Sequence, residues 1–501
     1  MTDTLAELNE VKDRFEIKSG LTAIESKVIQ RQPRPAMIIY VSRPTERLYK
    51  LLEEARSEGR DDDDETPTVT LKSKSHYNIL NSSEMKLFLR VLSESQNVNR
   101  HSFHEDFFDR YTHSVSGSEA QIISNANHVV LGRRGAGKSM LLLYAWHERR
   151  RQSKPSIWID MQVYSGREDD LVVRDVLKEV LTQVEPFLGS GKQYRQIVSL
   201  VEGPIRNLIE FRKSLPTIRK YLEGFSARQK ELFVFIDDLH VVAEKLQPIL
   251  LDVLYALARG NQVFLKISAI ETLTRTYDPG LRQGLEIPQD AQNLKLDYNL
   301  TVPDKAARQI GAILDAHAHY AGLPSIRRLC SSTSVLPRLT WVSAGVPRDA
   351  MNLFSQAINK AISEGRKRVT VSNVNVAASE TLTTKLREFN VDASDRSAPL
   401  NDLFESIRRF CVERERKNAF LVEVNTEHDL YANVMSLVQL RLLHIISEGI
   451  TVGQVGRKYI GLILDYGLYT GVRAAQSVVL FNRQTTKVAY RDLRALPVFR
   501  L

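Results

Sequence analysis

The sequence predicts an α/β fold built on a parallel sheet, flanked by an N-terminal α+β region and by helical and α+β regions toward the C-terminus. Three observations indicate this class. From about residue 105, short apolar runs alternate with helical segments; a glycine-rich turn joins the first run to the first helix; and a later run ends in two aspartates. Such alternation is typical of parallel sheets covered by helices on both faces.

Five apolar runs are predicted to form the strands, at 128–131, 156–160, 232–236, 263–267 and 293–296. Helical segments are expected between most of them, at 139–151, 171–184 and 247–258. The stretch 171–225 is too long for one crossover helix, so we expect a helical insertion between the second and third strands. The core is therefore assigned to residues 105–302.

The flanking segments read differently. Residues 1–104 form a region of no assigned role, with a polar helix, a strand at 37–41 and helices near 46–55 and 83–94. The run Asp61–Glu65 is expected to be a solvated loop, with a phosphate-mimicking or metal-binding role as the alternative. Residues 303–380 read as helical. Residues 381–501 are expected to hold helices at 403–413 and 431–447 and strands at 477–481 and 487–490.

The composition is typical of a globular protein, with 43% hydrophobic and 26% charged residues. Two cysteines exclude a disulfide framework, and no apolar run is long enough to cross a membrane, so we expect a cytoplasmic protein without a membrane partner. The formal net charge of +9 permits a polyanionic partner, or it reflects scattered solubilising charge.

The strongest motif spans residues 132–140. Gly132, Arg133, Arg134, Gly135, Ala136, Gly137, Lys138 and Ser139 match the pattern GxxxxGK[ST], followed by Met140. The motif lies between a predicted strand and a predicted helix, where amide N–H groups and a helix N-terminus can surround phosphate oxygens. Lys138 is expected to reach the β- and γ-phosphates of ATP, and Ser139 to ligate Mg²⁺. An ordinary glycine-rich turn is the alternative.

A second motif follows the third predicted strand, where an apolar run ends in Asp237 and Asp238. This position places Asp237 at the carboxyl edge of the sheet, where it can hold Mg²⁺, and Asp238 where it can polarise water as a general base. A surface turn is the alternative. Ser268, which ends the fourth strand, is expected to orient water or to be a plain strand-end serine. Arg348 opens a helix and could reach the γ-phosphate, or it is simply solvated.

The order GRRGAGKS, FVFIDD, FLKIS and GVPRDAMNLF resembles the AAA+ ATPases of the origin-recognition and replication-initiator type, and the related STAND ATPases. The resemblance covers about residues 105–380. It implies ATP held between a five-stranded core and a helical lid at 303–380, with Ser268 as sensor 1 and Arg348 as sensor 2. It also implies a homo-oligomer in which a neighbouring subunit supplies an arginine finger, for which Arg275 and Arg282 are both candidates.

Two features depart from the family pattern. The second acid is Asp238, where the family usually carries glutamate, which affects hydrolysis more than binding. The insertion at 171–225 and the first 100 residues have no counterpart. Initiators carry a winged helix after the lid, so residues 381–501 are interpreted as a winged-helix-like domain. Its basic residues favour DNA, whereas the apolar stretch 459–469 favours a protein partner.

These features predict an ATP-dependent switch that assembles into an oligomer, hydrolyses ATP and acts on DNA or on a co-encoded effector protein. Antiphage defence or a mobile element is the biological setting we expect by analogy. The alternative is a nucleotide-stabilised interaction scaffold with little hydrolysis. A P-loop kinase is a third hypothesis, which the sensor pattern disfavours.

Overall fold

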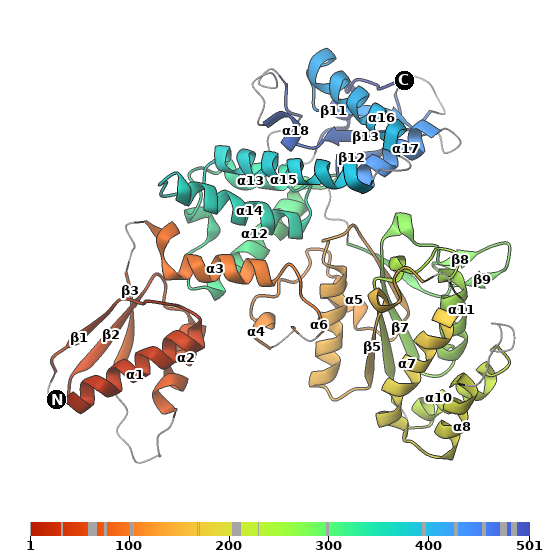
Figure 1. Ribbon diagram of the computed structural model, residues 1–501, viewed down its shortest axis with the longest axis horizontal. Helices are drawn as coiled ribbons and strands as arrows, with labels where there is room; N and C mark the ends of the chain where they lie inside the picture. The colour runs from red at the N-terminus through yellow and green to blue at the C-terminus, as the bar shows by residue number, and fades with distance from the viewer. Residues whose placement is uncertain are drawn as a thin grey trace. The chain divides into compact units, whose positions relative to one another are not determined.

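The computed structural model divides the chain into two compact units (Figure 1). Unit 1 holds residues 1–97, 104–112 and 298–501, and unit 2 holds residues 98–103 and 113–297. The acidic run Asp61–Glu65 lies outside the described residues. Those are 2–31, 34–58, 68–74, 78–100, 102, 105–167, 169, 171–202, 212–228, 230–296, 300–392, 397–424, 429–452, 457–470, 478–481 and 488–500.

Unit 2 is built on the predicted five-stranded sheet, in which every pair of neighbours is parallel. The order across the sheet is β10-β4-β7-β6-β5, so the fourth strand in sequence lies between the first and the third. Strand β6 is buried along its first five residues because helices cover both faces. The strands are β4 (His128–Leu131), β5 (Ser156–Asp160), β6 (Leu232–Asp237), β7 (Val263–Ala269) and β10 (Gln292–Lys295).

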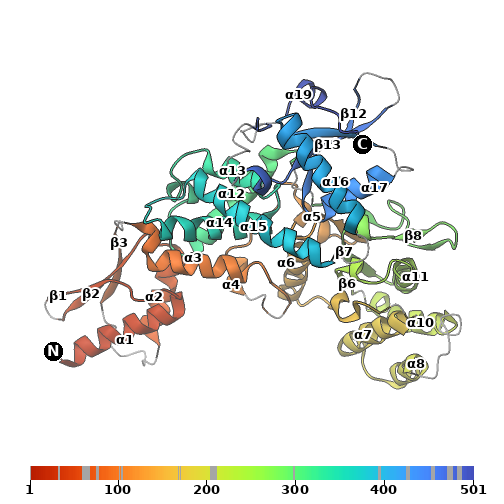
Figure 2. The same cartoon turned by 45° about the horizontal axis from the view of Figure 1, so that its top comes forward.

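Helices α6 (Lys138–Arg151) and α11 (Gln247–Ala258) connect strands of this sheet. The predicted insertion is helical and consists of α7 (Leu171–Leu188), α8 (Lys192–Glu202) and α10 (Leu215–Ala227), which gather at one end of unit 2 (Figure 2). Helix α7 forms because apolar residues recur at helical spacing, and that face is buried. The smaller elements are α5 (Ser118–Ile122), η2 (Met161–Tyr164), η3 (Leu239–Val241), η4 (Glu271–Leu273), β8 (Tyr277–Asp278) and β9 (Gln283–Gly284).

Unit 1 begins with a three-stranded sheet of order β1-β2-β3, in which β1 and β2 are antiparallel and β2 and β3 are parallel. Helices α1 (Thr2–Ser19) and α2 (Glu46–Ser57) lie side by side on one face of it (Figure 1). The predicted strand at 37–41 and helix at 46–55 are confirmed as β2 and α2. The sequence did not predict β1 or β3. The strands are β1 (Ser26–Ile29), β2 (Ala36–Val41) and β3 (Val69–Ser73).

The helical region of unit 1 packs directly on the N-terminal region. Helix α3 (Ser83–Glu94), preceded by η1 (Ile79–Asn81), contacts both α12 and α14, and the rings of Phe88 and Phe354 meet edge to face with centroids 6.3 Å apart. A single hydrophobic core therefore runs from the first helix into the helical region. The remaining helices here are α4 (Glu105–Phe108), α12 (Pro303–Tyr320), η5 (Ile326–Arg328), α13 (Val335–Val342), α14 (Pro347–Ser363) and α15 (Val371–Asp392).

The C-terminal part of unit 1 has an α+β order with an antiparallel sheet β11-β13-β12, which is a winged-helix-like arrangement. It docks on the helical region: α18 contacts α15, and a Cβ at Gly467 would lie 2.6 Å from Leu382 Cβ. Its elements are α16 (Ser397–Arg409), the π-turn η6 (Phe410–Arg414), β11 (Ala419–Glu423), α17 (Asp429–Gln439), β12 (Leu443–Ile450), β13 (Tyr459–Leu464), α18 (Gly467–Thr470) and α19 (Tyr490–Arg494).

Two predictions in this part are wrong. The predicted helix at 431–447 ends at Gln439, because the chain turns at Arg441 with φ of 61° and continues as strand β12. Of the two predicted C-terminal strands, the first is reduced to a single bridge between Val479 and Lys417, and the second is replaced at Tyr490 by helix α19. Residues 477 and 487 lie outside the described part of the chain.

A lysine is buried in the middle of β7, on the strand that carries Ser268. Lys266 is fully buried, and its Nζ donates to the carbonyl oxygens of Ser124 and Ala126 at 2.6 and 2.8 Å. The Nζ also lies 3.0 Å from His128 Nδ1. Burial, then Arg149, lowers the pKa of Lys266 to about 6, and burial, then Lys266, lowers the pKa of His128 to about 4.

These two groups predict how the stability of the protein depends on pH. Between about pH 4 and 6.5 the unfolded chain binds a proton at His128 that the folded chain does not, and between about pH 6 and 10.5 the same holds for Lys266. The free energy of unfolding should therefore rise with pH across this range, by about 1.4 kcal/mol for each unit of pKa difference. Urea titrations at several pH values check this. A His128→Phe variant that kept the full slope below pH 6.5 would contradict the assignment.

Candidate functional site

The turn between β4 and α6 has the geometry of a phosphate cradle. Gly135 and Gly137 adopt left-handed backbone angles, with φ of 84° and 97°, and Gly137 is the N-cap of α6. A Cβ at Gly137 would meet nothing within 4 Å, so its backbone angle, and not crowding, favours glycine there. Successive left-handed and right-handed residues turn amide N–H groups toward one point, which suits an anion at the start of a helix.

Lys138 lies in the first turn of α6 and is 94% buried. Its Nζ donates a hydrogen bond to the carbonyl oxygen of Arg133, 3.1 Å away, so the ammonium group folds back over the turn. Within the same turn, Ala136 is buried and Arg134 is exposed. A triphosphate in the cradle would offer the ammonium stronger, charged acceptors than one carbonyl oxygen.

Asp237 brings three elements of unit 2 together. Its Oδ1 accepts hydrogen bonds from Ser139 Oγ, 3.0 Å away at the start of α6, and from Ser268 Oγ on β7. The strand order explains the meeting, because β7 lies between β4 and β6 and all three end at one edge. Ser139, Asp237 and Ser268, which the sequence placed in one site, therefore lie together.

Asp238 follows directly and is held in an unusual conformation. Its φ of 58° and ψ of 44° are left-handed, which costs a non-glycine residue about 1–2 kcal/mol. Its N–H donates to Ser268 Oγ at 2.8 Å, and its Oδ2 accepts from Gln162 Nε2 at 3.3 Å. Backbone strain of this kind persists where the surroundings fix a side chain for function.

The carboxylates at this edge repel each other. Burial, then the charges of Asp238 and Asp160, raise the pKa of Asp237 to about 6, against the opposing effect of the two serine hydroxyls. Asp160 ends β5 and pairs in register with Asp237. The sequence analysis missed Asp160, Gln162 and His240. Asp160 could have been found, because it also ends an apolar run at the carboxyl edge of the sheet.

The donor set fits Mg²⁺ bound together with a nucleotide. Among the described residues, no group of three or more histidine, cysteine or carboxylate side chains is placed to hold a metal ion. Mg²⁺ commonly takes one or two protein oxygens and completes its shell with phosphates and water. Ser139 Oγ and the Asp237 carboxylate, 3.0 Å apart beside the cradle, would supply those oxygens.

The three candidate arginines occupy different places. Arg275 pairs with Asp278 at 2.9 Å, whereas Arg282 is exposed beside the β8–β9 turn with a left-handed φ of 52°. Arg348 belongs to unit 1, where it is exposed in the first turn of α14. Its neighbour Asp349 pairs with Arg441 of the C-terminal part, at 2.9 and 3.0 Å.

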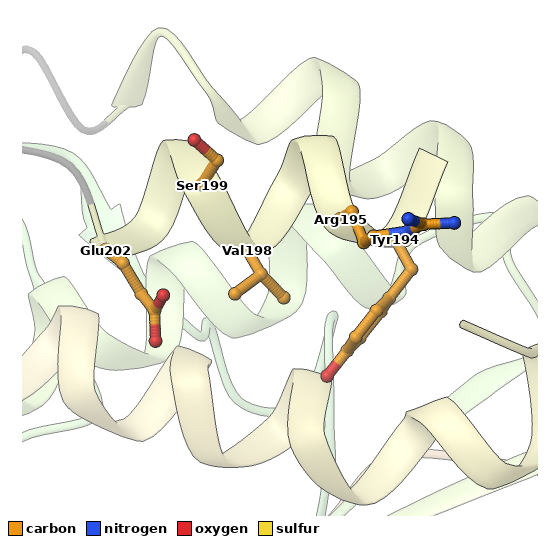
Figure 3. Close-up of a pocket in the computed structure, with 5 residues that line it drawn as sticks. All are labelled: Tyr194, Arg195, Val198, Ser199 and Glu202. Carbon is orange, nitrogen blue, oxygen red and sulfur yellow. The ribbon is translucent and has the colours of Figure 1, made fainter. Parts of the chain in front are cut away.

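A shallow pocket on the helical insertion (α7, α8 and α10) differs from the site described above. It is lined from one helix, α8, with Tyr194, Val198 and Glu202 directed to the same side (Figure 3). Ser199 on the opposite side and the exposed Arg195 complete the lining. It lacks the convergent amides of the cradle, so it is not the site that the motifs predict.

Comparisons with known proteins found similarity in structure only: no family model and no curated protein matches the chain. Cdc6p from Pyrobaculum aerophilum is 15% identical with a TM-score of 0.35, and the match covers 70% of this chain and 88% of that one. The Aeropyrum pernix ORC2 protein is 14% identical with a TM-score of 0.37, covering 72% and 92%. The Thermotoga maritima RuvB Holliday junction branch migration motor is 14% identical with a TM-score of 0.30, covering 70% and 95%.

The TM-scores are below 0.5, so the fold assignment depends on the strand order and on the positions of the motifs. The strand order and the motif positions agree with the P-loop core that the sequence predicts. Within the described part of the chain, no helix is both long and apolar enough to cross a membrane.

The double role of Ser268 leads to a prediction about stability. Ser268→Ala removes a donor to the Asp237 carboxylate and the acceptor of the Asp238 N–H, so we expect the free energy of unfolding to fall by about 1–3 kcal/mol. Chemical denaturation checks this, with Ser199→Ala on the exposed side of α8 as the control. Equal stability of the two variants would show that the serine does not support the acidic pair.

Proposed function

We propose that the protein binds Mg²⁺–ATP at the turn between β4 and α6 and hydrolyses it to ADP and phosphate. One observation carries the proposal: Ser139 and Ser268 both donate to Asp237 directly beside a left-handed glycine cradle. An isolated glycine-rich turn would not need a buried acid from one strand and a serine from another. The convergence of all these groups is what a bound metal–triphosphate complex requires.

Each residue has a role in this proposal. The amides of residues 135–139 and the ammonium of Lys138 bind the phosphate oxygens, and Ser139 and Asp237 hold Mg²⁺, which neutralises charge on the phosphates. Asp238 accepts a proton from the attacking water. Ser268, which already bonds both acids, keeps their relative orientation during the reaction. Because Asp238 has a shorter side chain than glutamate, we expect slow turnover.

In this proposal, ATP binding and hydrolysis switch the protein between an assembled and a disassembled state, as in AAA+ ATPases. Arg348, on the lid helix α14, reports the presence of the γ-phosphate, and an arginine of a neighbouring subunit completes the site in a homo-oligomer. Arg275 and Arg282 are both exposed, and Arg282 is the better candidate for that finger because Arg275 is paired with Asp278. The side chain of an arginine finger must extend from the surface of its own subunit to contact the phosphate bound by the neighbouring subunit.

DNA is the partner we propose. The stretch 459–469, whose apolar character favoured a protein partner, forms the buried strand β13 and leads into helix α18. Its tyrosines Tyr459, Tyr466 and Tyr469 are buried, so it offers little surface. Similar structures include the Aeropyrum pernix ORC1 protein in complex with DNA and Drosophila ORC bound to DNA. Antiphage defence or a mobile element remains the proposed setting, and a co-encoded effector the alternative partner. From the last turn of α16 to the start of β11, the exposed basic residues are Arg408, Arg409, Arg414, Arg416 and Lys417, and Arg494 is exposed further along the chain.

A nucleotide-stabilised scaffold is the second candidate function. The replacement of glutamate by Asp238 favours it, because hydrolysis depends on the reach of that base. Single-turnover hydrolysis with and without DNA separates the two functions. If the protein retains ATP but does not hydrolyse it, either with or without DNA, the scaffold function is the one supported.

Lys138→Ala tests the phosphate role. Losing a charged, buried donor to the triphosphate should weaken ATP binding by about 100-fold, and abolish turnover with it. Isothermal titration with a non-hydrolysable ATP analogue measures this, with the exposed Lys192→Ala as the matched control in the same unit. An affinity within a few-fold of the wild type would remove the proposed site.

Arg348→Ala tests the switch. We expect the variant to bind ATP with little change but to lose ATP-dependent assembly, because the arginine acts on the closed state and not on initial binding. Mass photometry with ATP and with ADP gives the oligomer distributions, and Arg327→Ala provides an exposed arginine of the same unit as control. An unchanged distribution under ATP would contradict the proposed sensor.

A further inference from the structure

His240 has a largely buried side chain whose ring lacks one hydrogen-bond partner. It lies in η3, just after β6, and its side chain is 8% exposed. Its Nδ1 is buried and has no hydrogen-bond partner among the described residues. The carboxylate oxygen Oδ1 of Asp238 is 3.8 Å from this nitrogen, which is too long for a hydrogen bond.

A structural histidine in the same chain looks different. His317 is also buried, but its Nδ1 lies 2.8 Å from the carbonyl oxygen of Ile313 and its Nε2 lies 2.9 Å from Ser95 Oγ. Both ring nitrogens are therefore satisfied, as expected for a core histidine. Like His240 Nδ1, His128 Nε2 lacks a partner among the described residues, so what distinguishes His240 is that its unpartnered nitrogen lies 3.8 Å from the Asp238 carboxylate, close enough to form a hydrogen bond after a small movement.

The surroundings of His240 place it at the phosphate cradle. Burial lowers the pKa of His240, Asp238 raises it, and Lys138 and Arg134 lower it further. Both cations belong to the glycine-rich turn, and His240 follows Asp237, whose carboxylate accepts a hydrogen bond from Ser139 next to that turn. A neutral imidazole has one N–H to donate, and the Asp238 carboxylate is the charged acceptor beside it.

Asp238 is already held from two other directions. Its N–H donates to Ser268 Oγ at 2.8 Å, and its Oδ2 accepts from Gln162 Nε2 at 3.3 Å. Its Oδ1 is the oxygen that faces His240. An N–H from His240 to Oδ1 would leave the carboxylate bonded at both oxygens, which fixes the plane of the group and not only its position.

We propose that His240 is a positioning residue for Asp238: its ring N–H closes on Oδ1 of Asp238 and, with Gln162 on Oδ2, aims the short carboxylate at the attacking water. The proposal rests on the proposed ATPase function. The distance must shorten by about 0.8 Å, and hydrogen bonds in active sites commonly tighten by such amounts when substrate binds. The left-handed backbone at Asp238 and this clamp together would offset the reach lost by the absence of a glutamate.

The test compares three substitutions at His240. His240→Leu and His240→Ala remove the donor, whereas His240→Asn keeps an N–H near the position of Nδ1. We expect the two variants without a donor to lose about tenfold in kcat with KM nearly unchanged, and His240→Asn to recover most of that loss. His319→Leu, at an exposed histidine, is the control, and unfolding midpoints with ATP affinities show that each variant is folded.

A second measurement isolates the path through Asp238. In an Asp238→Ala background, His240→Leu should cause no further loss of kcat, because no carboxylate remains to be aimed. Three results would overturn the proposal alone: an unchanged kcat in His240→Leu, an equal loss in His240→Asn, or a full additional loss in the Asp238→Ala background. If the wild-type protein shows no ATP turnover, or if its turnover is unchanged in Lys138→Ala, the proposed ATPase function is wrong, and the positioning role falls with it.

Discussion

One carboxylate organises the proposed nucleotide site. Asp237 ends strand β6, and the serines that bond it come from the start of helix α6 and from the neighbouring strand β7. Because burial and the adjacent acids raise its pKa, the ionised form depends on those hydroxyl groups. The glycine-rich turn, Ser139 and strand β7 thus meet at one negative charge, and the proposed Mg²⁺ would be the counterpart of that charge.

The same constraint explains why Asp238 is strained. A residue that follows the end of β6 must turn sharply if its side chain is to remain at the sheet edge, and the left-handed conformation achieves this. Ser268 serves both acids, one through its hydroxyl hydrogen and one through its oxygen lone pair. The short Asp238 side chain is held by a fixed backbone conformation, whereas a glutamate at this position could reach the same place without that constraint.

The sequence predicts the core well because strands buried on both faces are continuous apolar runs, and because GxxxxGK[ST] has a structural context that can be checked. It predicts the C-terminal part poorly. Val434, Leu437 and Val438 share the helical spacing that Ile445 and Ile446 also fit, yet the chain leaves the helix after Gln439. The left-handed turn at Arg441 has no glycine to mark it. Gln162 and His240 were missed because their roles depend on contacts across the sheet edge.

The contact between Phe88 and Phe354 has a consequence for how the gene can be altered. The first helices are not an appendage: they share one apolar interior with the helical and C-terminal regions. A chain shortened to begin near residue 98 would expose the surface that α3 covers on α12 and α14, and would tend to aggregate. The protein should therefore tolerate short insertions in exposed loops better than deletion of its first helices.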